Sequence, residues 1–137
     1  MELGFSPRII HTMLHVVDMP RALAFYCGVL AMEVKVERKN PDTGHHNIFL
    51  GYPDSRHSAE LELTAYEDRD SYEKGDAYGH IGMAVDDCAA ACEYFRSHGV
   101  AVVREPKTMP SGAVIAFIED PEGYQIEVIQ PAPPSNG

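Results

Sequence analysis

Two histidines and two glutamates occupy matching places in the two halves of the 137-residue chain. His11 and His80 each begin a short apolar segment that an aspartate closes, and Glu62 and Glu127 each alternate with apolar residues in a later segment. Two imidazoles and two carboxylates form a mixed nitrogen and oxygen set that suits a divalent transition metal. Four protein ligands leave two positions of an octahedron for water or substrate, which a catalytic metal needs. The sequence therefore predicts a metal site built from these side chains.

The two halves repeat one pattern at a fixed interval. His80 follows His11 by 69 residues, and Tyr94-Phe95 follows Phe25-Tyr26 by the same 69 residues. An interval of about 20 to 50 residues would indicate a solenoid, whereas this longer interval indicates a duplicated module. A single strand histidine is usually a structural residue, but recurrence in both modules favours one shared site. No site role is predicted for the histidines in expected turns or at a helix end, which are His45, His46, His57 and His98.

Each half is predicted to fold as one strand, one helix and three further strands. Hydrophobic alternation, turn residues and helix caps place these elements. The first half is expected to hold strands over residues 9–17, 32–38, 47–52 and 59–64 and a helix over 19–30. The second half is expected to hold strands over 80–85, 100–104, 112–119 and 124–130, a helix over 88–96 and a loop over 106–111. The predicted fold class is α+β, with two tandem βαβββ modules that form curved mixed sheets.

The modules are expected to share one domain over residues 1–137. Module 1 is predicted at about residues 8–66, a polar linker at about 67–77, module 2 at about 78–130 and a disordered tail at 131–137. If the first and last strands of a module are neighbours, its histidine and its glutamate can face the same side of the sheet. Pairing of the modules across a pseudo-twofold axis would then bring the four candidate ligands together.

Charge and hydropathy narrow the class of protein. The formal net charge is −10 and the 11 basic residues are scattered, which argues against nucleic acid or an anionic membrane as a partner. No run of about 18 apolar residues is present to span a bilayer, and residues 1–7 lack the basic and apolar regions of an export signal. The predicted location is the cytoplasm.

The chain contains three cysteines, Cys27, Cys88 and Cys92. Cys88 and Cys92 lie one helical turn apart, a spacing that a metal pair could use, but no second cysteine pair accompanies them. We interpret the cysteines as small, buried or half-buried residues in a reducing compartment.

Segments from about residue 10 to about residue 129 carry a family resemblance. They are His11–Leu14, Phe25-Tyr26 with Val29-Leu30, Glu62–Thr64, Ala77–Ile81, Ile115–Phe117, Glu119–Tyr124 and Ile126-Glu127. Together they resemble the vicinal-oxygen-chelate superfamily (the glyoxalase/bleomycin-resistance/dioxygenase fold), which is built from paired βαβββ modules. Within it, the chain is most similar to the short bacterial form of glyoxalase I (lactoylglutathione lyase). The resemblance implies four metal ligands, and they fall on His11, Glu62, His80 and Glu127.

The resemblance also implies a reaction. It is the metal-dependent isomerisation of the hemithioacetal of methylglyoxal and a thiol, glutathione or another carrier, to a lactoyl thioester through an enediolate. We assign Glu127 as the base that removes the carbon-bound proton, with Glu62 in the partner role on the opposite side. The resemblance implies a homodimer whose sites take His11 and Glu62 from one subunit and His80 and Glu127 from the other. It favours nickel or cobalt, with zinc as an alternative, because ligand types alone do not choose the metal.

The chain departs from the family where the thiol carrier is expected to bind. His15 stands at the position of the family's glutathione-binding arginine, Tyr66 near that of its asparagine, and residues 109–111 lack its loop lysine. An imidazole and a phenol form hydrogen bonds, but they do not supply the bidentate grip of a guanidinium. We expect His15 and Tyr66 to line the substrate site, with the metal chemistry retained and the carrier either bound weakly or a different molecule.

Three other functions remain open at this point. A metal-dependent epimerase of carboxylic thioesters typically has glutamine where Glu62 stands, and a metal-dependent dioxygenase commonly keeps three ligands. A non-enzymatic module that sequesters a small molecule would bind no metal.

Overall fold

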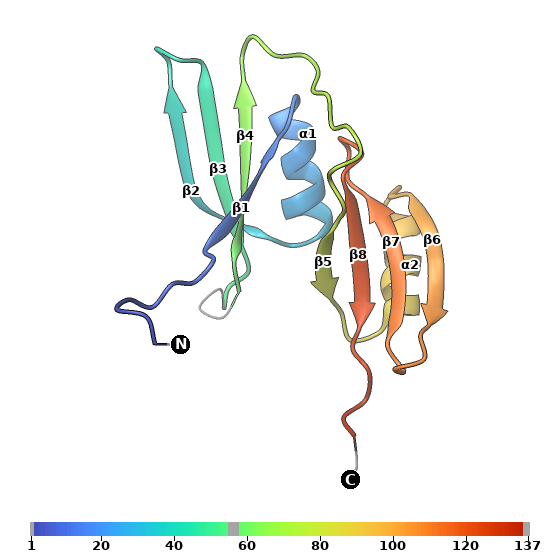
Figure 1. Ribbon diagram of the computed structural model, residues 1–137. Helices are drawn as coiled ribbons and strands as arrows, with labels where there is room; N and C mark the ends of the chain where they lie inside the picture. Colours follow the sequence, from blue (N-terminus) through green and yellow to red (C-terminus); the bar gives the residue numbers. More distant parts are fainter. Residues whose placement is uncertain (1, 55–57, 136–137) are drawn as a thin grey trace. The chain divides into compact units, whose positions relative to one another are not determined.

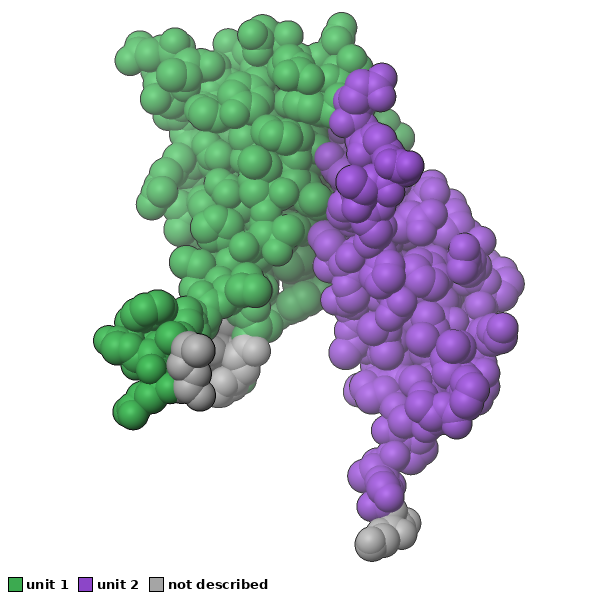
Figure 2. All heavy atoms as spheres, viewed as in Figure 1, with its two compact units in different colours: residues 1–72 green, residues 73–137 purple. Residues whose placement is uncertain are grey.

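Each half of the chain forms a compact unit around its own sheet. The computed structural model describes residues 2–54 and 58–135. Unit 1 comprises Met1–Tyr72 and unit 2 comprises Glu73–Gly137, drawn in green and purple in Figure 2. The boundary falls within the predicted linker over residues 67–77. That the two units form a single domain stays a prediction.

Unit 1 has a four-stranded mixed sheet in the order β1-β4-β3-β2 (Figure 1). Strand β1 pairs with β4 in parallel, and the other two pairings are antiparallel. The first and last strands of the module are therefore neighbours, as the predicted site requires. Its elements are β1 (His11–His15), α1 (Met19–Leu23), η1 (Ala24–Val29), β2 (Glu33–Asn40), β3 (His45–Gly51) and β4 (Glu60–Tyr66).

Unit 2 repeats this topology in the order β5-β8-β7-β6. Strand β5 pairs with β8 in parallel, and β7 pairs with both β8 and β6 in the antiparallel sense. The predicted α+β class and the two βαβββ modules are thus confirmed. The elements of unit 2 are β5 (Ile81–Ala84), α2 (Cys88–Ser97), β6 (Val102–Thr108), β7 (Val114–Glu119) and β8 (Gln125–Gln130).

One face of the unit 1 sheet is apolar and buried, and it leaves the opposite face for polar side chains. Leu14, Ile48, Leu61 and Leu63 are all buried on the first face, and α1 packs against β4. Because side chains alternate along a strand, Glu62 lies on the other face, between Leu61 and Leu63. The hydrophobic core therefore fixes the direction of the carboxylate.

The predicted helix over residues 19–30 changes its geometry halfway. It begins at α1, where the Asp18 side chain accepts a hydrogen bond from the Arg21 amide, and it continues as the π-helix η1. In η1 the amide of Leu30 donates to the carbonyl of Phe25, five residues back. This wider turn places the adjacent rings of Phe25 and Tyr26 in the core, with their centroids 4.8 Å apart.

Two predicted loops are shorter than expected. The loop over residues 106–111 is wrong in its first part, because β6 continues to Thr108. Pro106 is tolerated there because β6 is an edge strand with a register shift between Arg104 and Lys107. His45 and His46 are not in a turn either, because β3 begins at His45, paired with Asn40 on β2.

The ends of the chain carry no predicted site residue. Residues 131–135 contain no helix or strand. Residues 136 and 137, the last of the predicted tail, lie outside the described part of the chain, and so does His57.

No helix among the described residues is long and apolar enough to cross a membrane.

Candidate metal centre

The unit 1 pair, His11 and Glu62, is brought together by neighbouring parallel strands. The Nε2 atom of His11 lies 3.6 Å from Oε2 of Glu62. The histidine side chain is 38% exposed and the glutamate side chain 15%, so the imidazole is open and the carboxylate is largely shielded. Both groups are ligands that divalent transition metals accept.

The unit 2 pair, His80 and Glu127, has the same arrangement. His80 immediately precedes β5, and its Nε2 atom lies 3.2 Å from Oε2 of Glu127 on β8. The exposures again differ, at 43% for the imidazole and 18% for the carboxylate. Each module therefore presents one imidazole and one carboxylate from its two parallel strands.

A phenylalanine packs in a T-shaped arrangement with each of the two imidazoles. The ring centroids of His11 and Phe49 are 5.2 Å apart at an interplanar angle of 84°, and those of His80 and Phe117 are 5.3 Å apart at 82°. Phe49 is paired in register with Glu62, and Phe117 with Glu127. Each phenylalanine ring thus restricts the rotation of the imidazole beside the carboxylate. A metal ligand needs such support from its neighbours to keep its orientation.

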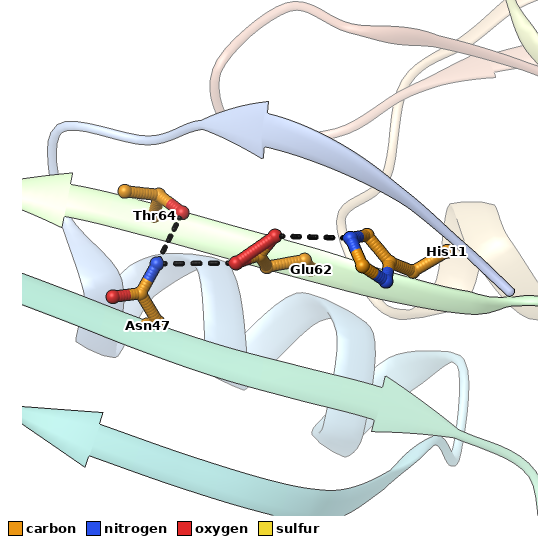
Figure 3. Close-up of polar contacts among 4 residues, drawn as sticks. All are labelled: His11, Asn47, Glu62 and Thr64. Atoms are coloured by element: carbon orange, nitrogen blue, oxygen red, sulfur yellow. Dashed lines mark hydrogen bonds and ion pairs between the residues drawn. The ribbon is translucent and has the colours of Figure 1, made fainter.

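The two carboxylates differ in one hydrogen bond. The Asn47 amide donates to Oε1 of Glu62 at 3.2 Å and to Oγ1 of the buried Thr64 at 2.8 Å (Figure 3). In unit 2 the corresponding place, two residues before the phenylalanine, is held by Ile115, whose side chain has no amide. Glu62 is therefore held by a neighbouring side chain, and the equivalent support for Glu127 is apolar.

Each pair offers only part of a coordination shell. Within residues 2–54 and 58–135, no group of three or more His, Cys, Asp or Glu side chains is arranged to hold a metal ion. Protein sites for transition metals generally use three or four ligands. The donor types of each pair fit a divalent cation.

The predicted substrate residues lie farther along the unit 1 sheet. His15 ends β1 and is paired in register with Thr64, and Tyr66 ends β4 and is paired with His45. The ring centroids of His15 and Tyr66 are 5.7 Å apart. His15 lies on the same face as Glu62, because its register partner Thr64 lies two residues beyond Glu62 on β4.

Several residues of this site were not predicted from the sequence. Asn47, Phe49 and Phe117 come from the middle strands, and only the strand register shows that they face the glutamates. A partial signal was present, because Phe117 follows Phe49 by 68 residues, close to the interval between the histidines.

Comparisons with known proteins agree with the fold. The family model for the Glyoxalase/Bleomycin resistance protein/Dioxygenase superfamily matches residues 8–128. The chain is 47% identical to a lactoylglutathione lyase of Haemophilus influenzae over 124 residues, which cover 90% of this chain and 92% of that protein. It is 44% identical to a lactoylglutathione lyase of Escherichia coli O157:H7 with the same coverage. The chain belongs to the glyoxalase/bleomycin resistance protein/dioxygenase superfamily.

Solved structures give the same result. Glyoxalase I from Zea mays aligns with a TM-score of 0.84 and 35% identity over 92% of this chain, which spans only 45% of the maize chain. A trypanothione-dependent glyoxalase I from Leishmania major aligns with a TM-score of 0.79 and 37% identity, over 90% of this chain and 86% of that one. The predicted family resemblance is confirmed.

Proposed function

We propose that this protein is a lyase of the lactoylglutathione lyase type, which converts the hemithioacetal of methylglyoxal and a thiol carrier into a lactoyl thioester. The observation that carries the proposal is the recurrence of one His–Glu pair in each unit, at 3.6 Å and 3.2 Å. Relatives that cover 90% of the chain are lactoylglutathione lyases, which supports the reaction. A reaction of this class moves one proton between neighbouring carbons and needs no external oxidant.

His11, Glu62, His80 and Glu127 are the residues proposed to hold one divalent metal ion. The ion would supply a Lewis acid that stabilises negative charge as it develops on the two substrate oxygens. Nickel or cobalt is favoured, with zinc as an alternative. The supporting observation is that each imidazole is exposed and lies in T-shaped contact with a phenylalanine, so the ring is both accessible and oriented.

Glu127 is proposed as the base that removes the carbon-bound proton and delivers it to the adjacent carbon. Glu62 takes the partner role on the opposite side. The difference in hydrogen bonding supports this division, because Asn47 donates to Glu62 and so holds its carboxylate in place. A base must change its protonation state during the reaction. Glu127, which has the apolar Ile115 in the place of that amide, is better suited to this task.

The thiol carrier is proposed to lie along the unit 1 face toward His15 and Tyr66. These two side chains provide rings and hydrogen-bonding groups, and neither provides a permanent charge. The Leishmania major relative is trypanothione-dependent, so carriers differ among similar proteins. Turnover of the glutathione hemithioacetal at millimolar concentration tests the carrier. A rate typical of the family would contradict weak binding of glutathione.

The complete site is proposed to form in a homodimer in the cytoplasm. His11 and Glu62 would come from one subunit, and His80 and Glu127 from the other. The small number of ligands in each unit supports an assembly of this kind. A reducing compartment is supported by the cysteines, because Cys27, Cys88 and Cys92 are all free thiols.

Metal analysis with matched histidine variants tests the proposal. We expect protein purified without chelator to bind about one divalent ion per proposed site, and His80→Ala to lower activity by at least about a hundredfold. His98→Ala is the control, because His98 caps the end of α2 and contacts neither pair. Retention of metal and activity by His80→Ala would show that the unit 2 pair is not part of the site.

The other candidate functions are less well supported. The presence of Glu62 rather than glutamine counts against an epimerase, and a fourth ligand counts against a dioxygenase. The lyase activity of the relatives argues against a non-enzymatic binding module.

A further inference from the structure

The two units hold their histidines in different ways. In unit 1, His11 belongs to β1 and is paired in register with Glu60 on β4. The amide of Glu60 also donates a hydrogen bond to the Ile10 carbonyl at 2.8 Å. In unit 2, strand β5 begins one residue after the histidine, at Ile81, so His80 precedes the paired part of its strand. The strand pairing that fixes the first histidine therefore stops short of the second.

The side chain of Tyr78 makes a contact at this point. Its hydroxyl donates a hydrogen bond to the backbone carbonyl of Gln125 at 3.0 Å. Gln125 precedes Glu127 by two residues on β8, just as Tyr78 precedes His80 by two residues. The hydrogen bond therefore ties the chain that enters β5 to the strand that carries the carboxylate.

The ring of Tyr78 is itself held by a second aromatic ring. The ring centroids of Tyr78 and Tyr124 are 5.1 Å apart at an interplanar angle of 66°, in T-shaped contact. Tyr124 is buried, and the Nζ atom of Lys74 lies 5.1 Å from the centroid of its ring. Because a T-shaped aromatic pair favours one relative orientation of its rings, packing also directs the Tyr78 hydroxyl.

The matching residue of unit 1 is an isoleucine. Ile9 lies 69 residues before Tyr78, the interval that separates His11 from His80. Its side chain has no hydroxyl and is 82% exposed. The first histidine is thus held by strand pairing, whereas the chain before the second is held by a tyrosine side chain.

We propose that Tyr78 is a positioning residue for His80. Its hydroxyl fixes the chain on the amino side of His80 and so keeps the imidazole beside the Glu127 carboxylate, at 3.2 Å, in the orientation that binds a divalent metal ion. This inference rests on the proposed function and adds to it a residue that acts on the metal through its ligand. Removal of the hydroxyl alone should loosen the ligand without unfolding unit 2.

The Tyr78→Phe variant tests this role, because it loses the hydroxyl and keeps the ring. Competition between the nickel-loaded protein and a chelating dye should show about fivefold weaker metal binding than in the unaltered protein. Tyr52→Phe is the matched control, since the Tyr52 hydroxyl donates to the Leu30 carbonyl at 2.8 Å, at the end of η1. It loses the same kind of hydrogen bond and should keep its metal affinity. Unchanged affinity in Tyr78→Phe would overturn the proposal, as would an equal loss in Tyr52→Phe.

The motion of the histidine rings gives a readout that involves no metal. In the metal-free full-length protein, NMR relaxation of the ring Cε1–H bonds should give a lower order parameter for His80 in Tyr78→Phe than in the unaltered protein. His11 is the internal control, because strand pairing holds it, and its order parameter should stay the same. An unchanged value for His80, or an equal decrease for both histidines, would contradict a positioning role.

Failure of this inference can be told apart from failure of the proposed function. Metal binding that depends on Tyr78, without turnover of the hemithioacetal, would leave the inference standing and remove the function. Turnover with unchanged metal affinity in Tyr78→Phe would do the reverse. At saturating nickel, Tyr78→Phe should regain most of the kcat with the KM unchanged, because the hydroxyl acts through the ligand and not on the substrate. A raised KM at saturating nickel would instead show an action on the substrate and overturn the inference.

Discussion

Asn47 distinguishes two glutamates that the sequence repeat makes equivalent. Glu62 and Glu127 both lie on the last strand of a module beside a histidine, but only Glu62 has an amide donor in the neighbouring strand. Side chains that support a metal ligand affect its affinity even when they do not touch the metal. The two carboxylates should therefore respond differently to changes in their surroundings.

Replacing Asn47 by leucine should weaken metal binding by roughly tenfold, because Glu62 loses the donor that holds its direction. A competition titration with a chelating dye measures this affinity. Asn47→Leu should also lower activity through the metal, so excess metal should restore most of the kcat. An unchanged metal affinity would show that the hydrogen bond plays no positioning role. Circular dichroism checks that the sheet remains folded.

Burial should protect the thiol of Cys88 from modification. It raises the pKa of Cys88 to about 11, with a smaller effect from the neighbouring Cys92, and the side chain is fully buried. At pH 8 only roughly one thiol in a thousand is then ionised. Iodoacetamide should label the partly exposed Cys27 first, and mass spectrometry of the digested protein should find Cys88 labelled only after denaturation. Rapid labelling of native Cys88 would contradict this picture.

At the residue scale, the sequence predicts the four proposed ligands but not their supports. His11 and His80 stand out because they recur at one interval, and the glutamates because each alternates with apolar neighbours. Asn47 has no such pattern. Its contact with Glu62 depends on the register between β3 and β4, which is not encoded in local spacing.

At the scale of elements, the buried face of each sheet fixes the position of the site. Leu61 and Leu63 are buried on either side of Glu62, and Ile126 and Val128 are buried on either side of Glu127. A shift of one residue in the register would turn both carboxylates toward the core. Core packing and ligand direction are therefore coupled in each unit.

Truncation of Leu63 to alanine should destabilise the protein by about 2–5 kcal/mol, because this fully buried side chain leaves a cavity under β4. Val36→Thr on the edge strand β2 is the control. Val36 is 39% exposed, and this change should cost less than about 0.5 kcal/mol. Urea denaturation followed by circular dichroism gives both values. Equal stability of the two variants would mean that β4 is not held by this core.

The helices and strands were mostly predictable, and the exceptions have physical causes. Asp87 caps α2 and Gly99 follows it with a φ of +76°, as the turn and cap residues indicate. The π-helical turn of η1 and the continuation of β6 through Pro106 were not predictable, because tertiary packing and an edge position override local preference in both.

At the scale of the whole molecule, the proposed dimer has a direct test by mixing variants. A His11→Ala subunit and a His80→Ala subunit are each expected to be inactive alone. In a mixed dimer with sites between subunits, one site regains all four ligands while the other loses both histidines. Statistical exchange should then restore roughly a quarter of the wild-type activity. No recovery after denaturation and joint refolding would place each site within one chain.

Asn47 contacts Glu62, and Ile115 takes the corresponding place beside Glu127. This difference bears on how the two copies of a duplicated module diverge. In the proposed function the two copies of the module supply one centre, and each copy is then free to specialise. The first copy holds its carboxylate with the Asn47 amide, whereas the second places the apolar Ile115 and Phe117 on the strand beside its carboxylate. Substitutions in the first copy should therefore act mainly on KM and metal retention, and those beside Glu127 in the second mainly on kcat. Selection could then change the choice of substrate while leaving the proton transfer intact.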